Sequence, residues 1–135
     1  MKEDYYKKVE KMFYNYKKID NKIEEILNKN SDKTDINSYI KTNYKTSREE
    51  LEVINKLDNL EIKRLLKEKY VVDRTLDKYE NDNRANIIKR RYFNGEKNYI
   101  IYDSMGLWKQ QYSDIVKEII NYATLVAVKI NLINI

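Results

Sequence analysis

Lysine, glutamine and serine side chains gather between residues 109 and 117, where their spacing suits contact with nucleic-acid bases. Glutamine can pair with adenine through two hydrogen bonds, and lysine can donate to the acceptor edge of guanine. On a helix that begins near residue 108, these side chains point outward from the first turns. The candidate base-reading residues are Lys109, Gln110, Gln111, Ser113 and Lys117.

Basic residues just before this stretch suit contact with a phosphate backbone. Residues 84 to 117 hold seven Lys and Arg against three acidic residues, so this quarter of the chain carries four of the five net positive charges. A basic segment in an otherwise balanced protein is typical of a backbone binder. The candidate backbone-contacting residues are Lys89, Arg90, Arg91 and Lys97. A structural role stays open for both arginines, whose stems can pack on Tyr92 or Phe93.

The composition argues against enzymatic chemistry. The chain has no cysteine and no histidine, which removes thiolate ligands, imidazole ligands and the commonest general base. No glycine-rich phosphate loop and no nucleophile–base arrangement is visible. The carboxylates lie on charge-mixed helix faces, where surface pairing is ordinary. We therefore expect no enzyme, no catalytic or metal-ligating residue and no cofactor.

The elements that position these residues are predicted to be helices. The 135 residues include no proline, and the two glycines, Gly95 and Gly106, bracket one short segment. Glycine and proline are the usual residues of tight turns, so their scarcity favours long helices over a sheet. The sequence predicts an all-α fold with helices over residues 2–29, 47 to 76 or 79, 84–93, 98–104 and 108–131.

The first of these helices carries an apolar stripe whose spacing alternates between four and three residues for over three heptads. Its members are Tyr5, Val9, Met12, Tyr16, Ile19, Ile23 and Ile26. We favour an amphipathic helix packed on its own domain, and a coiled-coil arm that pairs with a partner is the alternative. With a polar linker, which has a candidate short helix near 36–40, it forms a predicted unit of residues 1–46.

The second predicted unit, residues 47–135, starts at a capping box, Ser47-x-x-Glu50, and ends in an apolar tail. We favour a tail that closes the core of this unit, and an exposed partner site is the alternative. The apolar members of the tail are Val126, Val128, Ile130, Leu132, Ile133 and Ile135.

Gly106 predicts the sharp turn of a helix-turn-helix over about residues 98–117. Glycine takes the positive φ that such a turn requires. Tyr102 departs from the usual pattern, in which alanine stands where the two helices approach. Trp108, at the start of the second helix, is favoured as a core or staple residue, and a base contact is the alternative. The inward positions fall on apolar or aromatic residues, namely Ile101, Met105, Leu107, Tyr112 and Ile115.

The segment Arg90-Arg91-Tyr92-Phe93-Asn94-Gly95 resembles the Arg-Tyr-Phe-x-Gly element before the helix-turn-helix in the C-terminal region of bacterial sigma factors. Phage late-gene regulators of the ArpU and RinA type share this arrangement. Tyr112-Ser113-Asp114 followed by Ala123-x-x-x-Ala127 is similar to ArpU-type sequences. The resemblance covers about residues 47–131. It implies a transcription regulator of late phage or prophage operons with a sigma-factor-like helix-turn-helix.

We therefore expect a cytoplasmic, sequence-specific binder of double-stranded DNA that regulates transcription. RNA polymerase and a second copy of the chain, in a homodimer, are further candidate partners. No membrane contact is expected, because the most apolar stretch, residues 123–135, is too short to span a bilayer. Two alternatives stay open. A DNA-packaging subunit like the phage small terminase would assemble into a ring, and a helical protein-interaction module would not bind DNA.

Overall fold

The chain folds into helices, which confirms the all-α prediction. The computed structural model describes residues 2–29, 52 and 54–134, and no strand occurs in these ranges. The predicted linker with its short helix near 36–40, the capping box at 47–50 and the boundary at residue 46 lie outside the described residues. The helices are α1 (Lys2–Lys29), α4 (Leu60–Lys78), α5 (Asn83–Ile88), η1 (Lys89–Phe93), α6 (Asn98–Ser104) and α7 (Lys109–Lys129).

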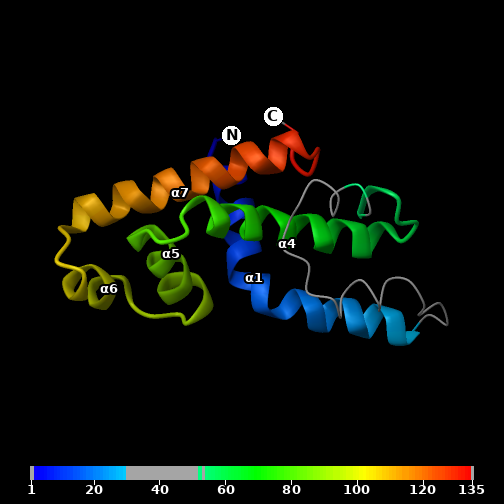
Figure 1. The fold of residues 1–135 in the computed structure, drawn as a ribbon, viewed down its shortest axis with the longest axis horizontal. Helices are drawn as coiled ribbons and strands as arrows, with labels where there is room; N and C mark the ends of the chain where they lie inside the picture. The colour runs from blue at the N-terminus through cyan, green and yellow to red at the C-terminus, as the bar shows by residue number, and fades with distance from the viewer. Residues whose placement is uncertain (1, 30–51, 53, 135) are drawn as a thin grey trace.

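The long helix α4 lies between α7 and the C-terminal half of α1 (Figure 1). The short helices α5 and α6 gather at the end of the molecule where α7 begins. The C-terminal end of α1 lies at the opposite end (Figure 1). The long N-terminal helix predicted from the heptad stripe is present over 28 residues.

The apolar stripe of α1 packs inside the chain. Val9, Ile19 and Ile23 are fully buried. Val9 belongs to a main core shared with α7, whereas Ile19 and Ile23 belong to a second cluster shared with α4. Phe13 and Leu27, which lie beside the predicted stripe, are buried as well. Contacts with α4 and α7 thus account for the stripe, and a coiled-coil partner is not needed to explain it.

The main core lies where α7 crosses α1 and α4. The rings of Phe13 on α1 and Tyr92 on η1 are 5.2 Å apart in this core. Each large apolar side chain buried here stabilises the fold by about 1.5–3 kcal/mol. One face of α7 supplies residues at spacings of one, three and four, namely Val116, Ile119, Ile120, Ala123 and Ala127.

The second predicted helix is interrupted, which corrects the expectation of one helix from residue 47 to 76 or 79. Residues 56–59 are not helical, and α4 begins at Leu60. The Asn59 side chain accepts a hydrogen bond from Ile62 N at 3.0 Å and satisfies a free amide of the first turn. Ile54 and Ile62 both belong to the second cluster, which α1 shares with α4. The apolar pattern therefore continues across the break and does not reveal where the helix is interrupted.

The predicted third helix consists of two kinds of turn, α5 and then the π-helical η1. Asp82 caps α5, since its carboxylate accepts a first-turn amide at 2.9 Å. In η1, Asn94 N donates to Lys89 O at 2.9 Å, five residues back. Wide turns of this kind are rare and often lie near functional sites. Gly95, with φ 66°, ends the segment as predicted.

The apolar tail packs on the main core, as favoured from the sequence, except for Ile135, which lies outside the described residues. Asn131 takes φ 61°, and Leu132 N donates to Ala127 O at 2.9 Å. This left-handed residue reverses the chain, so that Ile130 and Ile133 are buried. Among the described residues no helix, α7 included, has the length and apolar character needed to cross a membrane.

Candidate nucleic-acid interface

The break between α6 and α7 lies at Gly106, where the sequence placed it. Gly106 has φ 68°, and Leu107 N donates to Tyr102 O at 2.8 Å across the end of α6. No atom lies within 4 Å of a Cβ added to Gly106, so the glycine is required by its backbone angle and not by lack of space. The two helices are therefore separate elements joined by a tight turn.

The predicted inward positions of this helix-turn-helix all belong to the main core or pack against it. Ile101 and Tyr112 are buried, and Met105, Leu107 and Ile115 are half-buried. The bulky residue at position 102 is accommodated by a ring contact, because the Tyr102 and Tyr112 rings lie 5.6 Å apart at an interplanar angle of 53°. The departure from alanine therefore does not prevent the two helices from packing together.

A polar cluster centred on Arg91 joins α1, η1, α6 and α7. Arg91 Nη1 donates to Tyr112 Oη at 3.3 Å and to Asn98 Oδ1. Arg91 Nη2 lies 3.4 Å from Glu10 Oε2, and Tyr92 Oη donates to the same oxygen at 2.6 Å. Tyr112 Oη donates to Asn98 Oδ1 at 2.8 Å. These bonds fix α6 and the start of α7 relative to α1.

Tyr92, one of the two tyrosines of this cluster, stays protonated at neutral pH. Burial raises the pKa of Tyr92, and the hydrogen bond that it donates to Glu10 raises the pKa further. The phenol is therefore a permanent donor, which suits the Glu10 carboxylate it shares with Arg91. The side chains of Arg91 and Glu10 are only 19% and 17% exposed, so water screens their attraction weakly.

Arg90 is also engaged within the protein. Its guanidinium forms a two-point ion pair with Glu96, through Nε at 3.0 Å and Nη2 at 2.8 Å, and Nη1 donates to Ser104 Oγ at 2.5 Å. These bonds hold the pKa of the Glu96 carboxyl below its usual value. Both arginines predicted to contact a DNA backbone thus have intramolecular partners, while Lys89 and Lys97 are exposed.

The predicted base-reading residues lie on the outer face of the first turns of α7. Lys109, Gln110, Gln111 and Lys117 are exposed, and Ser113 is half-buried. Gln111 Oε1 accepts a hydrogen bond from Trp108 N at 2.8 Å, so this side chain caps the helix. Gln110 Nε2 donates to Asp114 Oδ1 at 2.9 Å along the same exposed face.

A shallow depression of about 530 Å³ lies between α6, η1 and the start of α7. It brings Lys97 and Lys109 together, two basic residues that the sequence assigned to different roles. Its tyrosines could not be predicted from the sequence, because helical spacing alone does not show which rings face solvent. The residues that line it are Tyr14, Arg91, Gly95, Glu96, Lys97, Asn98, Tyr99, Tyr102 and Lys109.

Trp108 corrects an expectation from the sequence, since its side chain is 78% exposed and does not pack in the core. Leu107, one residue earlier and one of the predicted inward positions, packs against the main core at the turn. Periodicity places both residues near the helix start but cannot tell which of them meets an opposing element.

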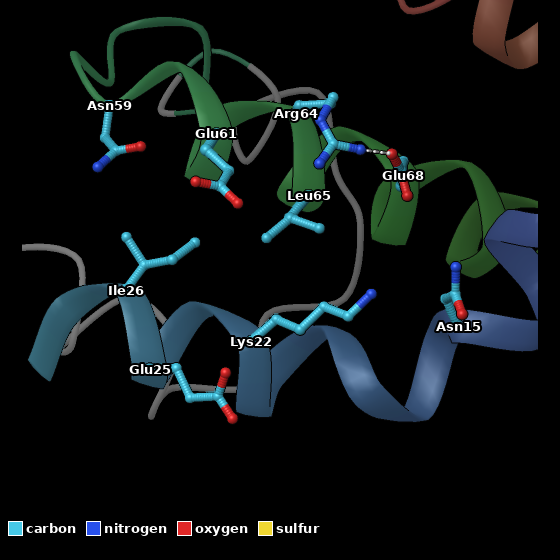
Figure 2. Close-up of a pocket in the computed structure, with 9 residues that line it drawn as sticks. All are labelled: Asn15, Lys22, Glu25, Ile26, Asn59, Glu61, Arg64, Leu65 and Glu68. Atoms are coloured by element: carbon cyan, nitrogen blue, oxygen red, sulfur yellow. Dashed lines mark hydrogen bonds and ion pairs between the residues drawn. The ribbon is translucent and has the colours of Figure 1, made fainter. Parts of the chain in front are cut away.

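A second pocket, of about 500 Å³, opens between α1 and α4 (Figure 2). Ile26 and Leu65 face each other across it, and Arg64 pairs with Glu68 at 2.6 Å. Lys22 and Glu25 of α1 carry opposite charges at its rim (Figure 2). In the described ranges no group of acidic residues is arranged to bind a metal ion. Two basic and three acidic residues line this pocket, so it has no positive excess that would attract a polyanion.

No family model, curated protein or solved structure matches the chain. The function is therefore argued from the site itself and from the sequence motifs.

Gly106→Ala tests the turn. We expect a loss of about 1–2 kcal/mol in the free energy of unfolding, because alanine is strained at positive φ. Gly106→Asn is the matched control and should lose less, since Asn81 and Asn131 already adopt this conformation in the chain. Urea unfolding measures both. Equal stability of Gly106→Ala and the wild type would show that the turn does not require glycine.

Arg91→Met tests the polar cluster. We expect it to lose about 2–3 kcal/mol of unfolding free energy, because the half-buried Glu10 and the buried Tyr112 lose a charged partner. Arg90→Met, whose ion pair with Glu96 is more exposed, should lose less than about 1 kcal/mol. If chemical denaturation finds the two variants equally stable, the cluster does not fix the helices as described.

Proposed function

We propose that this protein binds double-stranded DNA through the unit formed by α6, the Gly106 turn and α7, and that it regulates transcription sequence-specifically. The observation that carries the proposal is the two-sided character of the first turns of α7. Tyr112 and Val116 are buried against the rest of the chain. Lys109, Gln110 and Lys117 face solvent on the helix that follows the sharp turn. A second helix of this kind presents its N-terminal side chains to the major groove.

The distribution of paired charges supports a polyanionic partner. Arg90 neutralises Glu96, and Arg84 pairs with Glu118 on α7 at 3.0 Å. The basic residues near the turn that form no ion pair within the described part of the chain are Lys89, Lys97, Lys109 and Lys117. Glu96 and Glu118 are thus compensated by arginine, and the four lysines outnumber the two remaining acidic residues near the turn, Asp103 and Asp114.

The side chains divide into backbone contacts and base contacts. We assign phosphate contacts to the four lysines that form no ion pair, because the guanidiniums of Arg90 and Arg91 already have intramolecular partners. Gln110 is the favoured base reader, since its bond to Asp114 is fully exposed and exchanges readily with water. Gln111 holds the start of the helix instead.

The resemblance of the Arg90–Gly95 segment to late-gene regulators suggests that the genes controlled belong to a phage or prophage. Packing of the α1 stripe on α4 and α7 leaves less reason for a separate coiled-coil arm. A packaging subunit would share the same DNA-binding unit and would differ by forming a ring of many copies. Light scattering of the purified protein separates a monomer or dimer from such a ring.

The proposal predicts salt-dependent binding to duplex DNA. Four lysine–phosphate contacts give a slope of log K against log salt of about −4. Lys97→Ala combined with Lys109→Ala should reduce this slope by about 2, for every duplex sequence. Fluorescence anisotropy of a labelled duplex at several salt concentrations measures the slope.

The matched control is Lys22→Ala combined with Lys56→Ala. It removes the same charge from two exposed residues, one on the C-terminal half of α1 and one just before α4, and should leave the slope unchanged. If both double variants lower affinity equally, binding follows net charge and not the proposed surface. Absence of binding to any duplex at low salt would contradict the proposed function itself.

A further inference from the structure

Trp108 is a large apolar side chain that the fold leaves uncovered. It is the chain's only tryptophan, and 78% of it is exposed. Its backbone, by contrast, is held on both sides: Trp108 N donates to Gln111 Oε1 at 2.8 Å, and Trp108 O accepts from Tyr112 N at 3.0 Å. The backbone of Trp108 is therefore held at the residue before α7, while the indole faces solvent.

Packing does not account for a tryptophan at this position. Burial of a large aromatic side chain contributes about 1.5–3 kcal/mol to stability, and an exposed indole forgoes most of that contribution. Leu107 already provides the inward contact of the turn, so the core is closed without Trp108. An outward aromatic residue on a fixed backbone is instead suited to contact with a partner.

The surroundings of Trp108 favour a polyanion as that partner. Lys109 follows it directly and lines the depression together with Lys97. Tyr99 and Ile100, 53% and 43% exposed, lie on α6 at the same end of the molecule as the start of α7 (Figure 1). Apolar groups set among lysines complement a surface that is anionic at its edges and presents thymine methyl groups among polar base edges, as the major groove of DNA does.

We propose that Trp108 is a DNA-contacting residue that packs against the C5-methyl group of one thymine. This inference rests on the proposed function. The thymine methyl is the apolar group that the major groove presents, and the N-terminal end of the second helix is the part that approaches base edges. Gln110 supplies hydrogen bonds on the same turn, and Trp108 adds an apolar contact that selects thymine at one position.

The fluorescence of Trp108 tests the contact, because selective excitation of indole reports this residue alone. The probe is the tightest duplex recovered by selection from a random-sequence pool. We expect Trp108 emission to shift or to be quenched over the duplex concentrations at which anisotropy of the labelled duplex rises. Constant emission during binding would overturn the inference and leave the proposed function intact. A change with protein concentration alone would assign Trp108 to a second copy and overturn it as well.

Replacement of single thymines by uracil tests which group is contacted. Uracil lacks only the methyl, whose burial contributes about 0.8 kcal/mol, or about fourfold in Kd. For the wild type, one position should show this fourfold loss, and for Trp108→Ala the same position should show none. Tyr99→Ala is the matched control and should retain the fourfold loss.

Each result of the uracil series decides a specific point. Trp108→Ala should unfold at the same urea concentration as the wild type, since the indole is exposed, so a changed affinity is not a folding defect. If Trp108→Ala loses affinity on uracil replacement as the wild type does, another residue contacts the methyl and the inference is wrong. If neither protein binds any duplex in a salt-dependent way, the proposed function fails and the inference fails with it.

Discussion

The placement of α6 depends on the polar cluster around Arg91. A helix of seven residues is too short to be stable alone, and α6 buries only Ile101 completely. Its two ends are held instead by side chains of η1, since Asn98 bonds to Arg91 and Ser104 bonds to Arg90. Glu10 on α1 completes the cluster, so the N-terminal helix takes part in orienting the turn at Gly106. Loss of this cluster would therefore leave α6 without the bonds that hold its two ends.

This arrangement divides the basic residues by type. The planar guanidiniums of Arg90 and Arg91 form several directed bonds inside the protein, a task for which arginine is better suited than lysine. The lysines remain outside, where flexible point charges can follow a phosphate backbone. The π-helical turn of η1 presents both arginines to α6 while the adjacent Tyr92 enters the core. In the proposed function, structure and DNA binding would therefore depend on neighbouring residues of one segment.

Much of the fold could be predicted from the sequence because the chain has only two glycines and no proline to mark its turns. The glycines fixed the end of η1 and the turn before α7, and helical periodicity fixed α1, α6 and α7. The turn before α4 was missed, because Ile54 and Ile62 continue one apolar pattern across it. The partner of Arg91 could not be predicted, since Glu10 lies 81 residues away in the chain. Trp108 was misplaced for a related reason: periodicity defines a face, and only the tertiary structure shows whether anything covers it.

Backbone amide chemical shifts of the full chain, recorded with and without a bound duplex, test whether the first turns of α7, set by the Gly106 turn, form the surface that meets DNA. The largest changes should fall within residues 97–117, while residues 54–66 at the opposite end keep their shifts. Changes centred on the pocket between α1 and α4, with residues 97–117 unaffected, would contradict this assignment.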